Sequence, residues 1–203
     1  MNFCEWCDVV FEQFMATSWL EWLAVVSAFA CIYLAAKQHI LNWPISIISV
    51  LAYAILFYEG RLYGEMALQG YYLFTAIYGW YYWLKRKQEH KEPIVSFSRS
   101  KIGLILLITA VGAFLLGSFL AHFTDTDVAY VDGTLASISF VAQFLMTRKV
   151  LQNWLMWVVV DILYIPLFVY KGYYLTALLY AMLSYIAWLG YKDWRKTWKE
   201  SHS

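Results

Sequence analysis

An aspartate lies near the middle of an apolar stretch that is long enough to cross a lipid bilayer. The stretch covers residues 153–170, NWLMWVVVDILYIPLFVY, and Asp161 carries its only charge. A carboxylate placed in hydrocarbon costs ~3 kcal/mol or more, so we expect Asp161 to face a cavity lined by protein. The residues that share its helical face are spaced three or four positions apart: Asn153, Trp157, Asp161, Tyr164 and Phe168.

Amides and a hydroxyl in other apolar segments extend this candidate site. Gln143 follows Ser139 by four residues, so both lie on one helical face, and Gln69 lies in a separate segment. Contact with a ligand and hydrogen bonding between helices are both compatible with these side chains. Asn42 and Asn153 begin two segments, where capping of a helix competes with a role in ligand binding.

Aromatic residues also lie deeper than the two ends of the spans. The chain is 20% aromatic, which exceeds what two interfacial belts require. Tyr71, Tyr72, Trp157 and Tyr164 lie at such depths, where rings could stack on a flat or cationic ligand. For any single ring, packing between helices is the competing interpretation.

The composition is that of a membrane protein. Of the 203 residues, 62% are apolar and 14% are charged, against about 25% charged in soluble proteins. The net charge of +1 gives no support to a nucleic-acid partner. Cys4 and Cys7 form a single CxxC pair, which without a second pair is weak evidence for zinc or redox chemistry.

Seven apolar segments predict an all-α integral membrane protein, because each approaches the ~20 residues that a bilayer requires. The fifth segment is short and could begin near Val128. The seven segments are residues 19–36, 42–58, 63–84, 101–120, 133–147, 153–170 and 174–191.

The positive charges orient these segments. If seven helices alternate in direction, 13 of the 15 Lys and Arg residues fall on one side, and only Arg61 and Lys171 fall on the other. The positive-inside rule then predicts an N-terminus outside and a C-terminus in the cytoplasm.

The chain repeats itself with an offset of 111 residues. Asn42-Trp43 aligns with Asn153-Trp154, and the alignment covers two segments in each half, 42–58 and 63–84 with 153–170 and 174–191. Other aligned pairs are Tyr53 with Tyr164, Phe57 with Phe168, Gly79 with Gly190, Trp83 with Trp194 and Lys85 with Lys196.

Two three-helix repeats would insert with opposite orientations unless one extra helix separates them. The plain fourth segment restores the parallel orientation, so a 3+1+3 arrangement is expected. Parallel repeats of this kind are a transporter architecture, with the substrate between the halves near the midplane. The expected divisions are an extracytoplasmic segment 1–18, a first repeat 19–84, a link with the fourth helix 85–120, a second repeat 121–194 and a cytoplasmic tail 195–203.

Enzyme and channel functions have little support in the sequence. The four histidines lie in links or in the tail, and neither HExxH, GxSxG nor a phosphate-binding loop is present. No filter sequence or ring of charges indicates a channel. No cofactor is expected. A membrane-embedded enzyme or accessory subunit that uses Asp161 as a buried acid remains the alternative from another class.

Three long stretches resemble the PnuC family of vitamin transporters: residues 68–83, 142–172 and 177–194. The NWxxW pattern at residues 153–157 is the most specific part. The resemblance implies a SWEET-like fold of seven helices in the bacterial inner membrane, and a substrate that is nicotinamide riboside or, in relatives, thiamin or riboflavin. It also implies facilitated diffusion, with a cytosolic kinase that traps the vitamin as its phosphate.

By residue, the resemblance places six positions at or near the substrate: Gln69, Gln143, Asn153, Trp154, Trp157 and Asp161. Tyr72 and Tyr164 complete the predicted site. Asp161 could offset the charge of a pyridinium, and the amides could bind a carboxamide and ribose hydroxyls. Thiamin is also a flat cation, so it stays the second candidate. A homo-oligomer is possible.

Overall fold

The structure is a computed structural model that describes residue 15 and residues 18–59, 63–88, 94–124, 126, 128–170 and 174–201. The Cys4–Cys7 pair lies outside these residues. The described part of the chain folds into seven long α-helices. They are α2 (Trp19–Ala36), α3 (Asn42–Glu59), α4 (Tyr63–Gln88), α5 (Arg99–Phe123), α6 (Ala129–Thr147), α7 (Asn153–Tyr170) and α8 (Tyr174–Glu200).

The predicted segments match these helices. The fifth begins at Ala129, close to Val128 as expected, and the largest differences lie at polar ends. α8 continues to Glu200, through a stretch that was expected to be a tail, and α4 continues to Gln88. A helix that leaves the apolar layer keeps its internal hydrogen bonds, and a weak pair such as Lys196–Glu200 (3.9 Å) lies along that extension. Four helices are long and apolar enough to cross a membrane by length and composition alone: α2, α5, α6 and α7.

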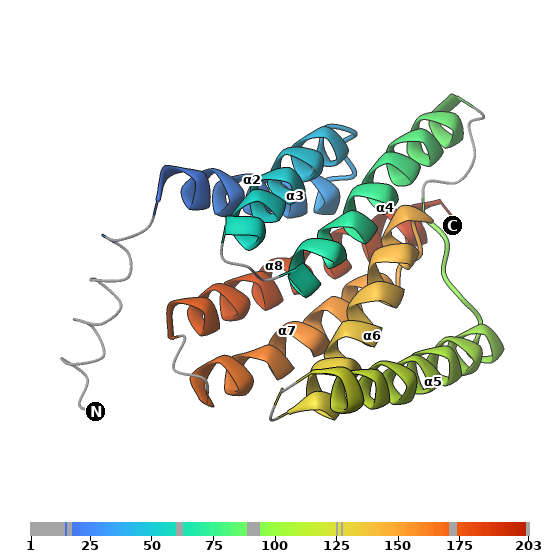
Figure 1. Ribbon diagram of the computed structural model, residues 1–203. Helices are drawn as coiled ribbons and strands as arrows, with labels where there is room; N and C mark the ends of the chain where they lie inside the picture. Colours follow the sequence, from blue (N-terminus) through green and yellow to red (C-terminus); the bar gives the residue numbers. More distant parts are fainter. Residues whose placement is uncertain are drawn as a thin grey trace.

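Six of the helices form a closed ring (Figure 1). α2 packs on α3, α3 on α4, α4 on α6, α6 on α7, α7 on α8, and α8 returns to α2. In this ring, α2, α3 and α4 take the same places as α6, α7 and α8 after a half turn. The arrangement therefore fits the expected pair of three-helix repeats.

α5 lies outside this ring against α6 (Figure 1). The two helices approach closely at Gly117 and Gly133, where a Cβ atom on Gly133 would collide with the backbone of Gly117. Ser137 adds a hydrogen bond to the carbonyl of Thr109 at 2.8 Å. Small residues and interhelical hydrogen bonds are the usual means of helix association in lipid. α5, the fourth apolar segment, therefore packs tightly against α6 as the linker helix.

The turns after α2 and α6 have the same backbone geometry. Gln38 and Lys149, which are 111 residues apart, are the two described non-glycine residues with positive φ, at 55° and 54°. Each turn closes with two hydrogen bonds of the Schellman type, for example His39 N to Leu34 O (2.8 Å) and Val150 N to Leu145 O (3.0 Å). We call the end of the ring that carries these turns the basic end.

A cluster of four tryptophans joins the two halves at the basic end. The Trp83 indole N–H donates to Thr147 O at 3.2 Å, and the Trp194 N–H donates to Ala35 O and Ala36 O, each at 3.1 Å. Each repeat therefore caps a helix of the other repeat. The rings of Trp43 and Trp83 meet edge to face at 5.2 Å, as those of Trp154 and Trp194 do at 5.5 Å.

Two glycines allow the indole rings of Trp43 and Trp154 to pack closely against the neighbouring helices. A Cβ atom on Gly79 would collide with the ring of Trp43, and a Cβ atom on Gly190 would approach the ring of Trp154 to 2.8 Å. Since any larger residue would displace a buried indole, the glycines that align in the repeat are explained by close packing.

Candidate functional site

The predicted face of α7 points into the protein. Asn153, Asp161 and Leu167 are buried, whereas Val159 and Ile162 on the other face are 49% and 50% exposed. The spacing of polar and aromatic residues in the sequence therefore identified the inward side of α7 correctly.

Asp161 is an unusual buried group. Its side chain is 4% exposed, and within the described part of the chain its carboxylate has neither a hydrogen-bond donor nor a cationic partner. A buried carboxylate is normally paired, because the loss of hydration is otherwise not compensated. An arrangement of this kind is expected where a ligand supplies the missing partner.

Tyrosines from four helices gather at Tyr180, which lies near this carboxylate. Tyr180 on α8 interacts electrostatically with Asp161 and Tyr164 on α7, with Tyr72 on α4 and with Tyr53 on α3. The ring of Tyr164 also packs against that of Tyr180, with centroids 4.7 Å apart. The fold thus brings together residues that are more than 100 positions apart in the chain.

The structure adds Tyr53 and Tyr180 to the residues near the predicted site. Tyr53 aligns with Tyr164 in the repeat, so the repeat itself was a signal for it. Tyr180 aligns with Gln69, and since the two residues differ in type, similarity could not have found it. Only the packing of α8 beside α7 brings Tyr180 to Asp161.

The two predicted glutamines differ in their surroundings. Gln143 on α6 donates to the Thr75 hydroxyl on α4 at 3.3 Å, close to where Tyr71 donates to Phe140 O at 2.8 Å. Gln69 is 8% exposed, and its amide has no hydrogen-bond partner among the described residues. Gln143 therefore joins the neighbouring helices α4 and α6, while Gln69 has no hydrogen-bond partner within the described part of the chain.

The remaining predicted residues lie nearer the basic end. Trp157 packs against the tryptophan cluster and also against the smaller apolar cluster around Val160. Asn153 donates to Val150 O at 2.6 Å, and Trp154 is 1% exposed within the tryptophan cluster. Asn153 Oδ1 and the indole N–H of Trp154 are both buried without a partner in the described structure.

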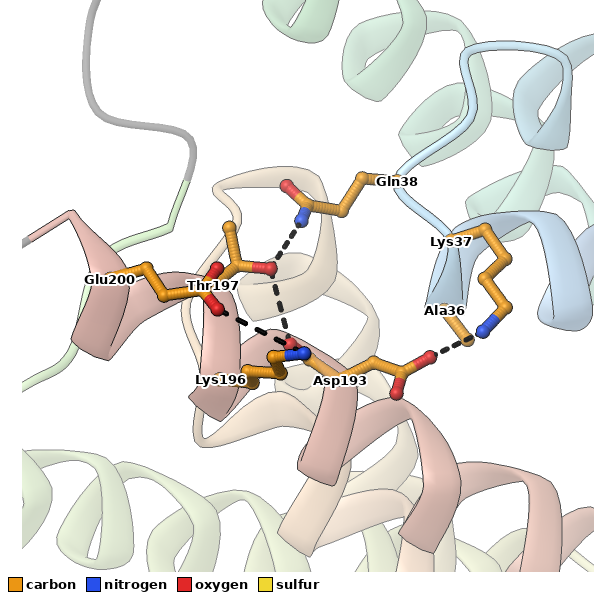
Figure 2. Close-up of a pocket in the computed structure, with 7 residues that line it drawn as sticks. All are labelled: Ala36, Lys37, Gln38, Asp193, Lys196, Thr197 and Glu200. Atoms are coloured by element: carbon orange, nitrogen blue, oxygen red, sulfur yellow. Dashed lines mark hydrogen bonds and ion pairs between the residues drawn. The ribbon is translucent and has the colours of Figure 1, made fainter.

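A pocket of about 240 Å³ opens at the surface of the basic end, where α2 meets α8 (Figure 2). It is lined by polar and charged side chains, and Lys37 and Asp193 in it form an ion pair at 2.6 Å. None of the predicted site residues lines it. Among the described residues, no group of His, Cys, Asp and Glu is arranged to hold a metal ion.

A ring of membrane-crossing helices that encloses a carboxylate, amides and several aromatic rings is the arrangement of a small-molecule transporter. The comparison with protein families agrees with this class: residues 18–196 match the family described as nicotinamide mononucleotide transporter. The chain belongs to this family and is a multi-pass membrane protein.

Related proteins carry names that refer to vitamins. The nicotinamide riboside transporter PnuC of Escherichia coli is 27% identical over 92% of this chain and 89% of its own length. The riboflavin/roseoflavin transporter RibM of Streptomyces davaonensis is 24% identical over 92% of this chain and 88% of its own.

A solved structure shows the same fold. This chain superposes on the structure described as "Crystal structure of the Vitamin B3 transporter PnuC" with a TM-score of 0.74. The sequence identity is 27%, and the match covers 95% of this chain and 87% of the other. The expected all-α, seven-helix class and the resemblance to PnuC transporters are therefore confirmed.

Proposed function

We propose that this protein carries nicotinamide riboside across the bacterial inner membrane by facilitated diffusion. The observation that carries the proposal is the buried Asp161 carboxylate, which lacks a partner in the described structure and interacts with Tyr180 beside Tyr53, Tyr72 and Tyr164. Nicotinamide riboside is a flat pyridinium, so its charge complements the carboxylate and its ring complements the tyrosines. The name of the Escherichia coli relative supports the same substrate.

The predicted residues divide into three roles in this proposal. Asp161 offsets the positive charge, and the aromatic rings of Tyr72, Trp157 and Tyr164 stack on the pyridinium. Gln69 and Gln143 bind the carboxamide or the ribose hydroxyls. Asn153 and Trp154 form the floor toward the basic end, and each has one buried polar atom without a partner in the described part of the chain.

The charge of Asp161 also separates the candidate substrates. The riboside is a cation, whereas the mononucleotide carries a phosphate whose negative charge would face the carboxylate. Riboflavin is neutral and would not compensate a buried carboxylate. Thiamin is the second candidate, because it is also a flat aromatic cation.

In this mechanism the gradient of the free vitamin drives uptake, and a cytosolic kinase keeps that gradient. Phosphorylation adds negative charge to the vitamin, so the product no longer fits a site built around a carboxylate and is retained in the cell. The proposed orientation has the N-terminus outside and the basic end in the cytoplasm, in accordance with the positive charges of the sequence.

Uptake into vesicles that contain the purified protein tests this proposal. Labelled nicotinamide riboside should equilibrate without ATP or an ion gradient, and unlabelled riboside should compete far better than the mononucleotide or riboflavin. Accumulation that requires a sodium or proton gradient would contradict facilitated diffusion. Stronger competition by thiamin than by the riboside would make thiamin the substrate.

The variant Asp161→Asn isolates the role of the charge. It should weaken binding of the cationic riboside ~10- to 100-fold, because a close charge pair at low solvent exposure contributes a few kcal/mol. Binding of a neutral analogue with a reduced, uncharged ring should change little. Equal losses for both ligands would show that Asp161 supports the structure instead of binding the cation.

A further inference from the structure

The two places where the repeats meet at the basic end differ in charge. α2 meets α8 at one seam, and α4 meets α6 at the other, and residues of the two seams correspond with the offset of 111. The corresponding residues are Lys37 and Arg148, Gln38 and Lys149, Tyr82 and Asp193, and Arg86 and Thr197.

The α2–α8 seam is neutralised. The Lys37 ammonium bonds to Asp193 at 2.6 Å, and the Gln38 amide donates to the Thr197 hydroxyl at 3.5 Å (Figure 2). The hydrogen bond and charge of Asp193 raise the pKa of Lys37. One cation meets one anion here, and a neutral amide meets a neutral hydroxyl.

The α4–α6 seam holds cations in the corresponding places. Arg148 donates to the Tyr78 hydroxyl and lies 4.6 Å from the ring centre of Tyr82, which takes the place of Asp193. Lys149 lies 4.3 Å from the ring centre of Trp83 and 3.4 Å from Gln38 Oε1. Aromatic faces thus support both cations, and neither cation contacts a carboxylate among the described residues.

Arg86 lies close to Lys149 in this seam. Burial, and then the charge of Arg86, lower the pKa of Lys149 to about 8. The end of α6 does not present bare carbonyls that would oppose an anion. The carbonyls of residues 144–147 accept bonds from Arg148 N, Val150 N, Lys149 N and the Trp83 indole.

We propose that the α4–α6 seam binds the phosphate group of an anionic phospholipid. Arg148 is exposed at the end of α6, where a guanidinium can hold a phosphate through two parallel hydrogen bonds. Below it, along the outer surfaces of α4 and α6, lie Phe144, Ile77 and Tyr81, which are 48%, 55% and 62% exposed. The acyl chains would cover this apolar strip, so the occupant is a lipid and not a free phosphate.

Lipid binding to the purified, delipidated protein tests the inference by native mass spectrometry. Phosphatidylglycerol should bind more tightly than phosphatidylcholine, and inorganic phosphate in excess should not displace it. Arg148→Gln should weaken the binding of phosphatidylglycerol about fivefold, and the double variant Arg148→Gln with Lys149→Gln should weaken it about 25-fold. The expectation follows from about 1 kcal/mol of binding free energy for each cation near a membrane surface.

Lys37→Gln is the matched control, because it removes the same charge at the corresponding position of the neutralised seam. Its affinity for phosphatidylglycerol should stay within about twofold of the wild type. Equal affinity for the two lipids, or equal losses in Lys37→Gln and Arg148→Gln, would overturn the site. Displacement of phosphatidylglycerol by inorganic phosphate would overturn the lipid as its occupant. Melting temperatures of the lipid-free variants confirm that each is folded.

Discussion

The basic end and the interior of the ring follow the internal repeat to different degrees. At the basic end, paired residues make the same bonds: Trp83 and Trp194 each cap a helix of the other repeat, and Gln38 and Lys149 share one backbone conformation. In the interior, Asp161 corresponds to Val50. The halves therefore share the turns and the tryptophan caps of the basic end, and they differ where a ligand would lie and in the charges of the two seams.

A ligand without twofold symmetry explains this difference. Symmetric contacts suffice to hold two similar three-helix units together, because each unit presents the same surfaces. A vitamin presents a charged ring on one side and hydroxyls on the other, so a symmetric interior would match only one of them. Gln69 and Tyr180 illustrate the divergence, since an amide without a hydrogen-bond partner among the described residues corresponds to a phenol in the other half.

The largest effect is expected where the halves are most alike. Trp83→Ala and Trp194→Ala should each reduce the free energy of unfolding by about 3–5 kcal/mol, the usual cost of truncating a buried aromatic residue. Unfolding in detergent, followed by circular dichroism, measures both. Trp83→Phe and Trp194→Phe retain most of the packing and should lose only about 1 kcal/mol with the indole hydrogen bond. A large loss of unfolding free energy at only one of the two positions would show that the two tryptophans are not equivalent.

Making the interior symmetric should separate stability from function. Asp161→Val gives the second half the same residue as Val50, the corresponding position of the first half. It also removes a buried carboxylate that has no partner in the described structure. The variant should be about 1–3 kcal/mol more stable, yet bind nicotinamide riboside at least tenfold more weakly. Thermal unfolding and ligand titration on the same preparation measure the two effects. A destabilised variant would show that the carboxylate has a structural partner.

The two turns offer a smaller, matched comparison. Glycine adopts positive φ without strain, whereas alanine does not, so Gln38→Gly should be about 1 kcal/mol more stable than Gln38→Ala. Lys149→Gly and Lys149→Ala should differ by the same amount, because both backbones have φ near 55°. Each Gly–Ala pair removes the same side-chain contacts, so the difference in unfolding free energy reports the backbone alone. Unequal differences would mean that the turns are not equivalent.

The smallest effect concerns pH at the α4–α6 seam. Below pH 8 Lys149 is charged and contributes to anion binding; above its pKa of about 8 it is neutral. Affinity for phosphatidylglycerol should therefore fall two- to fivefold as the pH rises from 7 to 9, with a midpoint above 8 because the bound anion favours the charged lysine. Lys149→Gln should abolish this step, and Lys37→Gln should retain it. An unchanged step in Lys149→Gln would assign it to another group.

Much of the scaffold followed from local patterns in the sequence. The apolar segments predicted every described long helix, and the largest errors at the ends arose where helices continue into polar residues, as α8 does to Glu200. The repeat paired Trp83 with Trp194, and the structure shows that their indoles make corresponding hydrogen bonds. The alternation along α7 identified the buried face of Asp161, because period and hydrophobicity are properties of the chain itself.

The sequence alone therefore determined the class of protein, the helices, the internal repeat and the inward face of α7. Only the tertiary structure decided which helices close the ring, that Tyr180 lies near both Asp161 and Tyr53, and that one seam pairs its charges while the other gathers cations. The reason is physical. A helix forms from residues three or four positions apart, whereas a site forms between helices, where partners more than 100 residues apart are selected by packing.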